Sequence, residues 1–468
     1  MQKQDKVKTS QNKVKLYKYI ADKDINVKTS ENTTICNTKK ISFAQSLGNK
    51  HIAKVFKELE SDDLTILLDE SLARYSTMRV GGVARVVALP NNFGAFLRVF
   101  ECARVQNFPY YILGNGSNTL CSSSGFDGVV ICTKNMNKIS FRALLHTPAR
   151  KLQKCIFQSK KENATNAKHS KIANNNINIS ETNVHIGQNC AQNGNAEGKK
   201  NNTAYKQNVN FQKLPRKGLI KNATLSVFAE CGALLPLLSK RACDLSYQGL
   251  EFACGIPASC GGAVKMNAGA FGGQMADIVS RVLIFNLNTL SIYYKYNENF
   301  IKYFNFLTKK HKKNTKNIKI SQKRLKNAVC EFLKFEYRKT NIADYEFVIG
   351  VEFVLRREYK NDIKKRCAEN TRRRRQTQSV GYPSLGSVFK RNGDFIPSAF
   401  FDKHGFKGLS LGGAQVSNIH AGYIVNYSNA TSEDILKLLK FLQNYICKIS
   451  NIMLQYELKF LGDCNEKK

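Results

Sequence analysis

Residues 249–273 read GLEFACGIPASCGGAVKMNAGAFGG and hold seven glycines, one proline and mostly small apolar side chains. An ordinary helix or strand would not accept so many glycines, because each interior glycine costs up to about 1 kcal/mol relative to alanine. A flexible linker would be polar, and this stretch is apolar. The pattern therefore indicates ordered backbone packed against something large. A ligand such as a phosphate, which glycine lets backbone N–H groups approach, and a buried turn between strands are the two interpretations.

The composition bounds the class of protein. Of the 468 residues, 42% are apolar, enough for two or three domains with real cores. The net charge of +38 comes from 73 basic and 35 acidic residues. This charge lies mainly in Lys- and Asn-rich segments and no aromatic–basic stripe accompanies it, so nucleic-acid binding is disfavoured as the main function.

The 14 cysteines show no CxxC pair and no zinc spacing. They suit reduced, structural thiols in a cytosol, and no metal site is expected. The polar sequence after Met1 has no signal-peptide pattern, and there is no run of about 18 apolar residues. We therefore expect neither secretion nor membrane insertion.

Hydrophobic periodicity predicts alternating strands and helices on both sides of the glycine-rich stretch. Before it, we expect strands at 83–89, 110–113, 128–132 and 223–231, and helices at 41–59, 93–105 and 234–244. After it, we expect a strand at 281–287, segments at 332–340 and 347–355 that pair, a charged helical linker at 358–378, strands at 409–416, 424–426 and 453–460, and a helix at 432–449. Thr431 or Ser432 is a natural N-cap for the last helix.

A second glycine-rich turn, GNGSNT at 114–119, follows directly after the strand expected at 110–113. Its backbone N–H groups and the side chains of Ser117 and Asn118 suit a pyrophosphate, although many strand ends carry Gly and Asn. The strand–helix–strand–turn order is typical of α/β structure. No GxGxxG follows a first strand, so a dinucleotide-binding Rossmann sheet is not expected.

Five stretches, taken in order, resemble the UDP-N-acetylenolpyruvoylglucosamine reductase family, flavoenzymes that complete UDP-N-acetylmuramate in bacterial cell-wall synthesis. They are STMRVGG (76–82), LGNGSN (113–118), the stretch 249–273, FEYR (335–338), and a C-terminal set of GYPSLGSVFK (381–390), GGAQVS (412–417) with His420, and LQYE (454–457). The likeness covers about 64–141, 215–290, 330–357 and 380–464. The extra tyrosine-containing motif of the longer subtype is not found, which favours the shorter subtype.

The resemblance implies an α+β fold with a two-lobed FAD-binding domain of the vanillyl-alcohol-oxidase (PCMH) type and a C-terminal α/β substrate-binding domain. The expected organisation is a disordered tail (1–40), a lead-in helix (41–63), the FAD-binding domain (64–357) with low-complexity insertions at about 142–215 and 290–330, a basic linker (358–379) and the substrate-binding domain (380–464).

The resemblance also implies a cytoplasmic, monomeric enzyme that uses FAD and NADPH to reduce UDP-N-acetylglucosamine enolpyruvate for peptidoglycan synthesis, and hence for cell shape and division. Cofactor contacts are implied at Gly81, Gly82, Gly114, Asn115, Gly116, Ser117, Asn118, Thr119, Gly255, Ile256, Pro257, Gly261, Gly262, Ala263, Asn267 and Ala268. Substrate contacts are implied at Tyr382, Lys390 and Gln415, whereas His404 and His420 are expected to be structural.

Three catalytic residues follow from the resemblance: Ser387 as proton donor, Arg338 as stabiliser of the substrate carboxylate, and Glu457 as the group that polarises the enolate. An Arg fork matches a carboxylate and keeps its charge. Without the resemblance, the ordinary interpretations are a surface cation in a strand for Arg338, a turn residue for Ser387 and a solvated strand face for Glu457.

Two departures from the family pattern stand out. Ala258 replaces the usual glycine after Ile-Pro, and Arg391 follows Lys390 without a proline. The change at Ala258 is small if its φ is negative and costly otherwise. Two alternatives remain: another FAD-dependent oxidoreductase of the same cofactor fold, or a decayed basic protein that binds RNA.

Overall fold

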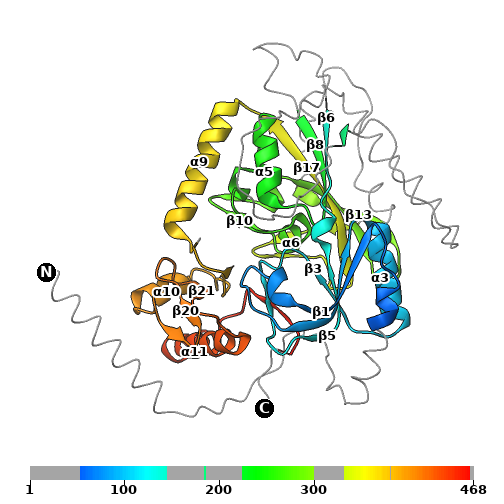
Figure 1. The fold of residues 1–468 in the computed structure, drawn as a ribbon. Helices are drawn as coiled ribbons and strands as arrows, with labels where there is room; N and C mark the ends of the chain where they lie inside the picture. Colours follow the sequence, from blue (N-terminus) through cyan, green and yellow to red (C-terminus); the bar gives the residue numbers. More distant parts are fainter. Residues whose placement is uncertain (1–52, 145–183, 186–223, 300–330, 380, 464–468) are drawn as a thin grey trace, which may run out of the picture. The chain divides into compact units, whose positions relative to one another are not determined.

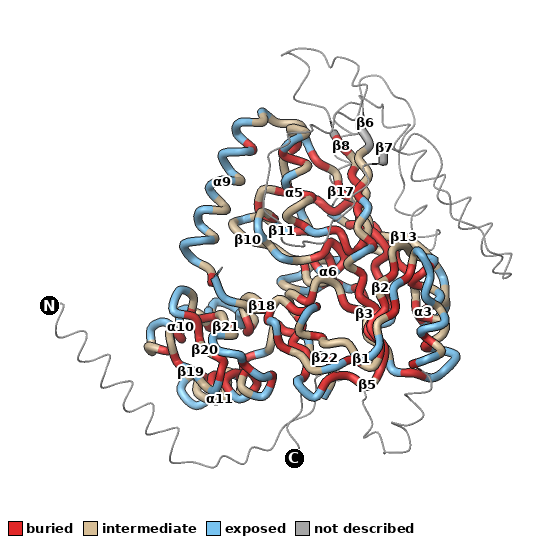
Figure 2. Tube along the Cα trace, viewed as in Figure 1, coloured by how far each residue is buried: buried red, intermediate tan, exposed pale blue. Residues whose placement is uncertain are grey.

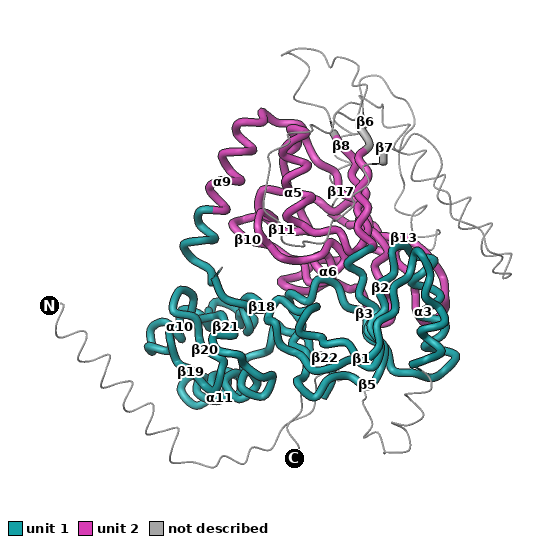
Figure 3. The backbone as a smooth tube through the Cα atoms, in the orientation of Figure 1, with its two compact units in different colours: residues 1–135, 372–468 teal, residues 136–371 magenta. Residues whose placement is uncertain are grey.

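The computed structural model describes residues 53–144, 184–185, 224–299, 331–379 and 381–463. Tertiary contacts divide the chain into two units, one made of residues 1–135 with 372–468 and the other of residues 136–371 (Figure 3). Each unit has its own hydrophobic core. The domain boundaries expected from the sequence stay a prediction.

The first unit begins with a four-stranded sheet in the order β1-β2-β5-β3. Strands β1, β3 and β5 are labelled in Figure 1. Its elements are β1 (Leu64–Ser71), η1 (Leu72–Tyr75), β2 (Val83–Pro90), α3 (Phe93–Val105), β3 (Tyr110–Leu113), β5 (Phe126–Cys132) and η2 (Thr133–Asn135). β1 and β2 are antiparallel, whereas β5 runs parallel to β2 and β3. Asn92 caps α3 by accepting a hydrogen bond from the Ala95 N–H (2.9 Å), and helical spacing buries Phe96, Val99 and Phe100.

The C-terminal part of the first unit is a second four-stranded sheet, in the order β18-β21-β20-β19. Its elements are β18 (Ser384–Ser387), α10 (Pro397–Lys403), β19 (Ser410–Leu411), β20 (Ala414–Val416), β21 (Tyr423–Asn426) and α11 (Ser432–Ser450). Thr431 and Asp434 form a capping box at the start of α11. The last strand, β22 (Lys459–Leu461), pairs in parallel with β4 (Thr119–Cys121), so the two parts of this unit share a small sheet.

The second unit contains an eight-stranded sheet in which β17 lies between β12 and β8. Its strands are β6 (Ile139–Leu144), β7 (Val184–His185), β8 (Thr224–Glu230), β9 (Tyr247–Gln248), β12 (Val279–Asn286), β13 (Ile292–Asn297), β14 (Phe332–Leu333) and β17 (Glu346–Arg357). β17 begins with a continuous buried run, as expected for a central strand (Figure 2).

The remaining elements of the second unit are short hairpins and helices. They are α5 (Leu235–Asp244), η4 (Glu251–Ala253), α6 (Cys260–Lys265), β10 (Gly269–Ala270), β11 (Gly273–Gln274), η5 (Met275–Asp277), β15 (Phe335–Glu336), β16 (Lys339–Thr340) and α9 (Lys360–Thr377), whose last turns belong to the first unit. The glycine-rich stretch therefore runs from η4 through α6 and β10 to β11.

Most elements expected from the periodicity are confirmed. β3 and α3 have the expected bounds, and β2, β5, β8, β12, β21, α5, α9 and α11 agree within two residues. Thr431 is the N-cap of α11. Of the helix expected at 41–59, residues 53–57 are helical, 58–59 form a turn and Phe56 is buried, while 41–52 lie outside the described residues. The tail at 1–40 lies outside the described residues.

Four expectations are wrong in part. The segment 332–340 does not pair with β17: β15 pairs with β16 across a two-residue turn, and β17 pairs with β12, β8 and β9. The strand expected at 453–460 is limited to β22 at its end, and the one at 409–416 is a hairpin of β19 and β20. The insertion expected at about 142–215 begins after β6 and contains β7, and the rest of it lies outside the described residues.

The second insertion also begins too early in the sequence-based prediction. Residues 292–297 form β13, an ordinary strand paired with β12. Its pattern was hidden because Lys295, a charged residue, is buried in it. The Lys295 Nζ lies 2.8 Å from Glu346 Oε1, and both side chains are at most 3% exposed. Residues 300–330 lie outside the described residues.

Candidate active site

The turn between β3 and β4 is built around Gly116. Its φ is +62°, and a Cβ atom there would come within 2.0 Å of the Tyr75 carbonyl oxygen. The Gly116 carbonyl accepts hydrogen bonds from the Thr77 N–H (3.2 Å) and hydroxyl (3.4 Å). Glycine is therefore required at this position by the packing of the protein itself.

The same turn leaves backbone donors available. Among the residues that the structure describes, no acceptor is found for the N–H groups of Gly116 and Ser117. Ser117 is half-buried. Unpaired N–H groups in an ordered, partly buried turn are suited to an anionic ligand, because such groups are nearly always paired in folded proteins.

Gly81 and Gly82 are explained by packing inside the first unit. A Cβ atom at Gly82 would lie 2.2 Å from the Ser123 carbonyl oxygen, and one at Gly81 would lie 2.8 Å from Cys121 Cβ. The Gly82 N–H also donates to the Ser122 carbonyl (2.8 Å). These two glycines let neighbouring backbone approach, and their role toward a cofactor stays a prediction.

In the second unit, the glycine-rich stretch is anchored on one side and exposed on the other. The N–H of Gly261 donates to the Cys231 carbonyl (2.8 Å), and a Cβ atom at Gly261 would meet Cys231 Cβ at 2.8 Å. Gly255, Pro257 and Gly262 are exposed. At Gly262 a Cβ atom would make only an ordinary contact, 3.4 Å from Ser259 Oγ, so the protein fold does not itself require glycine there.

Ala258, the departure from the family pattern, fits without strain. It is not among the described residues with positive φ. Its carbonyl accepts the Leu235 N–H (3.0 Å), and its side chain packs on the core of the unit. Alanine therefore replaces glycine here at little cost.

Asn267 connects this stretch to the β15–β16 hairpin. The side chain is buried, and its Nδ2 donates to Gln274 Oε1 (3.0 Å) and to the Glu336 carbonyl (2.8 Å). Its Oδ1 accepts the Ala276 N–H (3.1 Å). Asn267 also has φ +41°, a conformation that Asn tolerates better than most residues. Both amide protons are thus used within the protein.

Arg338 lies in the two-residue turn of that hairpin, not in a strand. Its φ is +53°, at a turn position where Gly or Asn is usual. The guanidinium donates to the carbonyls of Gly269 (3.1 Å) and Asn267 (3.4 Å), and it lies 5.2 Å from the ring centroid of Tyr337. A half-buried arginine in strained backbone is a feature of functional sites more than of surfaces.

Ser387 ends β18 directly after a β-bulge. Gly386 has φ +80°, and a Cβ atom there would meet nothing within 4 Å. Glycine is therefore favoured by the backbone conformation and not by a lack of space. The pairing of β18 with β21 shifts register between Ser384 and Ser387. Bulges re-aim side chains. Ser387 is half-buried, and among the described residues its hydroxyl has no hydrogen-bond partner.

The segment that contains Glu457 is distant from Ser387 in the sequence but lies beside it in the fold. Its N–H donates to the carbonyl of Val388 (2.9 Å), and the Lys390 N–H donates to the Gln455 carbonyl (2.9 Å). The Asn118 Nδ2 donates to the Glu457 carbonyl (2.9 Å). The first unit therefore brings together three of the predicted segments: the 114–119 turn, the end of β18 and the segment of Glu457.

Thr77 belongs to this arrangement although the sequence assigned it no role. Besides its contacts with Gly116, its hydroxyl donates to the Ser384 carbonyl (2.7 Å) at the start of β18. The signal in the sequence for a role of Thr77 was its position within the STMRVGG stretch. A hydroxyl that joins two turns from distant parts of the chain cannot be recognised from sequence spacing alone.

The predicted substrate residues have mixed surroundings. Tyr382 is 49% exposed and its ring lies 5.5 Å from that of Tyr427. Lys390 is half-buried. The Gln415 Nε2 donates to Ser410 Oγ (2.9 Å), so this amide is engaged in its own hairpin.

The two histidines make internal contacts. His404 Nδ1 lies 2.8 Å from the Phe400 carbonyl oxygen, and its ring stacks on Phe400 at 3.9 Å. His420 Nδ1 accepts the Gly422 N–H (3.1 Å), and burial lowers the pKa of His420. In the described part of the chain, no group of acidic, His or Cys side chains could hold a metal ion. None of its helices is long and apolar enough to span a bilayer.

Comparison with known proteins finds similarity to one family. Residues 378–461 match the family described as UDP-N-acetylenolpyruvoylglucosamine reductase, C-terminal domain. The enzyme of that name from Caldanaerobacter subterraneus is 26% identical over 399 residues, which cover 85% of this chain and 94% of the relative. That of Clostridium botulinum strain 657 is 27% identical over 417 residues, covering 89% of this chain and 98% of the relative.

The fold is also similar to a solved structure. The crystal structure of UDP-N-acetylenolpyruvylglucosamine reductase (MurB) from Thermus caldophilus matches with a TM-score of 0.51 and 23% identity, covering 85% of this chain and 99% of the other. At this identity the match shows the fold alone, which is of the expected α+β type.

Proposed function

We propose that the chain is a member of the UDP-N-acetylenolpyruvoylglucosamine reductase family and that it reduces UDP-N-acetylglucosamine enolpyruvate to UDP-N-acetylmuramate with NADPH and FAD. This reaction supplies a peptidoglycan precursor. The observation that carries the proposal is the adjacency of the Ser387 and Glu457 segments, which are joined by the hydrogen bond from the Glu457 N–H to Val388. A flavoenzyme of the same cofactor fold with a different substrate would not need both residues together.

The residues present fit FAD. In the first unit, the 114–119 turn offers the N–H groups of Gly116 and Ser117 to a phosphate, and backbone donors suit a pyrophosphate. In the second unit, the exposed side of 255–262 leaves room at Gly262 that the protein fold does not use. FAD, when bound, supplies to the enolpyruvyl group the hydride that originates from NADPH.

We assign to Ser387 the role of proton donor. After the terminal carbon of the enolpyruvyl group gains hydride, the adjacent carbon carries negative charge and takes a proton from the Ser387 hydroxyl. The absence of a hydrogen-bond partner for this hydroxyl, among the described residues, supports the role, because a structural serine in a half-buried position would be paired.

We assign to Arg338 the binding of the substrate carboxylate. Its guanidinium is held by two carbonyls, which take up some of its N–H groups and fix its plane without neutralising its charge. A planar fork with fixed orientation matches a carboxylate in two hydrogen bonds. The charge that spreads from the reacting carbon onto the carboxylate is thereby stabilised.

We assign to Glu457 the role of polarising the enolate. To stabilise a developing negative charge it has to carry its own proton and donate it in a hydrogen bond. Its backbone is fixed from two sides, by Val388 and by the Asn118 side chain. We assign Tyr382, Lys390 and Gln415 to the uridine diphosphate or sugar of the substrate, and a monomer in the cytoplasm is the proposed working form. None of the nine cysteines among the described residues forms a disulfide, which supports a reducing compartment.

The test is an anaerobic two-step reaction on the full-length protein, followed by the visible absorbance of the flavin. We expect NADPH to bleach the flavin, and UDP-N-acetylglucosamine enolpyruvate to restore its absorbance. Bleaching without recovery would contradict the assigned substrate. A colourless protein that gains no absorbance on incubation with FAD would contradict the flavin assignment.

A further inference from the structure

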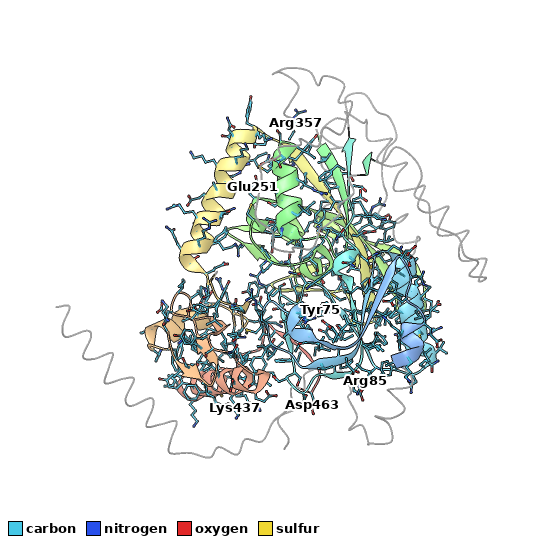
Figure 4. All side chains as sticks on the ribbon, in the orientation of Figure 1. Tyr75, Arg85, Glu251, Arg357, Lys437 and Asp463 are labelled. Atoms are coloured by element: carbon cyan, nitrogen blue, oxygen red, sulfur yellow. The ribbon has the colours of Figure 1, made fainter. Side chains whose placement is uncertain are left out.

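A buried ion pair in the second unit has no part in the reaction as described so far. Lys295 belongs to β13, and Glu346 is the first residue of β17, whose last residue, Arg357, is labelled in Figure 4. The Lys295 Nζ lies 2.8 Å from Glu346 Oε1 and also donates to Glu346 Oε2 at 2.8 Å. Their side chains are only 3% and 2% exposed. Such a pair calls for an explanation, because taking two charges out of water is costly.

Both members of the pair have further polar partners. The Tyr293 hydroxyl donates to Glu346 Oε1, and the Ala343 N–H donates to Glu346 Oε2 (2.7 Å). The Lys295 Nζ also lies 2.8 Å from Glu331 Oε2, on an exposed side chain. The charges are therefore hydrogen-bonded on several sides, which is the condition under which a fold tolerates a buried ion pair.

One bond of Lys295 leads from the ion pair to the hairpin that carries Arg338. The Lys295 Nζ donates to the carbonyl of Asn341 (3.2 Å), the residue directly after β16. Asn341 closes the base of the hairpin, because its N–H donates to the Lys334 carbonyl (3.3 Å) and its Oδ1 accepts the Lys334 N–H (2.8 Å). Lys334 directly precedes β15. The buried ammonium thus holds the base of the hairpin whose turn contains Arg338.

The hairpin depends on outside contacts for its orientation. β15 and β16 have two residues each and pair at only two positions. A hairpin of two strands is at best marginally stable on its own in water. Nearer the turn, Asn267 Nδ2 donates to the Glu336 carbonyl (2.8 Å) and the Thr340 hydroxyl donates to the Lys265 carbonyl (3.0 Å). The bond from Lys295 is the corresponding support at the base.

We propose that Lys295 is a positioning residue for Arg338: through the Asn341 carbonyl it fixes the base of the hairpin, and with it the direction in which the guanidinium meets the substrate carboxylate. The inference rests on the proposed function and on the role assigned there to Arg338. A buried ion pair commonly adds no stability over apolar residues of similar volume. Lys295 and Glu346 are therefore explained by the hydrogen bond that they direct at Asn341.

The experiment removes this hydrogen bond without leaving a buried charge unpaired. In the full-length protein, Lys295→Met combined with Glu346→Gln deletes both charges and keeps a neutral acceptor at position 346. Stopped-flow absorbance follows the flavin in both half-reactions. We expect reoxidation by UDP-N-acetylglucosamine enolpyruvate to slow roughly 10- to 100-fold, because a small misplacement of a group that orients the substrate has an effect of this size. Reduction of the flavin by NADPH should be unchanged.

The matched control is Arg281→Met combined with Glu352→Gln. This half-buried pair joins β12 to β17, with Arg281 Nε 2.5 Å from Glu352 Oε2, and its other side-chain hydrogen bonds go to Ser226 and Tyr296. It should react like the wild type in both half-reactions, and urea unfolding compares the stability of the two double variants. Equal kinetic losses in both, or unchanged reoxidation in Lys295→Met/Glu346→Gln, would overturn the proposal.

Two further variants keep the test decisive. Glu346→Gln alone leaves the Lys295 ammonium beside Glu331 and bonded to Asn341, so its reoxidation should stay close to that of the wild type; a loss as large as in the double variant would contradict the role of the Asn341 bond. If Lys295→Met/Glu346→Gln does not fold, Lys295→Leu with Glu346→Leu replaces the pair by apolar residues and is measured in the same way. A wild-type flavin that the substrate does not reoxidise would contradict the proposed function instead.

Discussion

Arg338 and Ser387 are held in place by different kinds of contact. The turn of Arg338 depends on side chains, because Asn267 bonds the Glu336 carbonyl and the Thr340 hydroxyl bonds the Lys265 carbonyl (3.0 Å). Ser387 depends on the backbone, through the Val388 N–H to the Gly422 carbonyl (3.0 Å) and the Glu457 N–H to Val388. Backbone contacts survive side-chain substitution. Ser387 can therefore be changed in isolation, whereas Arg338 can be displaced by changes in its neighbours.

Backbone strain is distributed differently as well. Arg338 itself has φ +53°, whereas beside Ser387 the positive φ of +80° falls on Gly386. A non-glycine residue in the left-handed region costs roughly 1–2 kcal/mol. The fold relieves this strain near Ser387 with a glycine and retains it at Arg338. We infer that the side chain of Arg338 is kept for function in spite of its conformation.

The largest effect is expected from Ser387→Ala. Loss of the proton donor should lower turnover of the enolpyruvyl substrate by about 10²–10⁴-fold. Reduction of the flavin by NADPH should be unchanged, and the free energy of unfolding should shift by less than about 0.5 kcal/mol, because the hydroxyl has no partner among the described residues. Stopped-flow measurement of both half-reactions checks this. Normal flavin reoxidation by the substrate would remove Ser387 from the mechanism.

A smaller loss, about 10²–10³-fold, is expected when Arg338 is replaced by lysine. Lysine keeps the charge but lacks the planar fork that binds a carboxylate in two hydrogen bonds. Arg338→Gly serves as the companion variant: it should be equally inactive and no less stable by more than about 1 kcal/mol, since glycine accepts φ +53° without strain. Steady-state kinetics and urea unfolding measure the two effects. An active Arg338→Gly enzyme would mean that the arginine is structural.

Asn267→Asp tests whether Arg338 depends on its neighbours. Aspartate keeps the acceptor for the Ala276 N–H but loses both donors, including the one to the Glu336 carbonyl. We expect about a tenfold loss in kcat/KM and a loss of about 1–3 kcal/mol in stability. The matched control is Asn341→Asp, which removes an exposed amide bond to the Phe332 carbonyl (2.8 Å) in the same region.

A double-mutant cycle separates positioning from general destabilisation. If Asn267 acts through Arg338, the losses in kcat/KM of Asn267→Asp and Arg338→Lys should be less than additive when combined. Fully additive losses, or an equal kinetic loss in Asn341→Asp, would show that Asn267 supports the fold alone. The cycle therefore measures the side-chain dependence that distinguishes Arg338 from Ser387.

The sequence predicts most helices and strands well, because their apolar residues recur with simple periods. Helices α3 and α11 have amphipathic spacing and side-chain caps, and β3 ends at a glycine-rich turn. β13 was missed because a buried ion pair replaces an apolar residue in its pattern. The pairing predicted for 332–340 was wrong because this segment forms a hairpin of its own. Its two-residue turn has Arg338 at positive φ and lacks the Gly or Asn that usually indicates such a turn.

The site shows the same limit. Family resemblance supplied Arg338, Ser387 and Glu457, and spacing alone would have left each with an ordinary surface or turn role. The contacts made by Thr77 and by the amide of Asn267 depend on segments that are distant in sequence and meet only in the fold. Short-range patterns cannot show such contacts, because they follow from the packing of the whole unit.

The smallest effect concerns the turn behind Ser387 and tests its backbone support. His420 Nδ1 accepts the Gly422 N–H, and the Gly422 carbonyl in turn accepts the N–H of Val388. Burial is the main cause that lowers the pKa of His420; it outweighs a backbone hydrogen bond that raises this pKa, and the charge of Lys407 lowers it further against that of Asp402. Between the folded pKa and the unfolded pKa of about 6.5, the folded protein therefore keeps this ring neutral while the unfolded chain takes up a proton. The stabilisation is present above pH 6.5 or so and is lost as the pH falls through the folded pKa. Urea unfolding at neutral and mildly acidic pH should show that the wild type loses more of its free energy of unfolding than His420→Gln on acidification. An equal loss in both proteins would mean that this turn does not respond to pH, and the backbone ladder at Ser387 would then be independent of His420 ionisation.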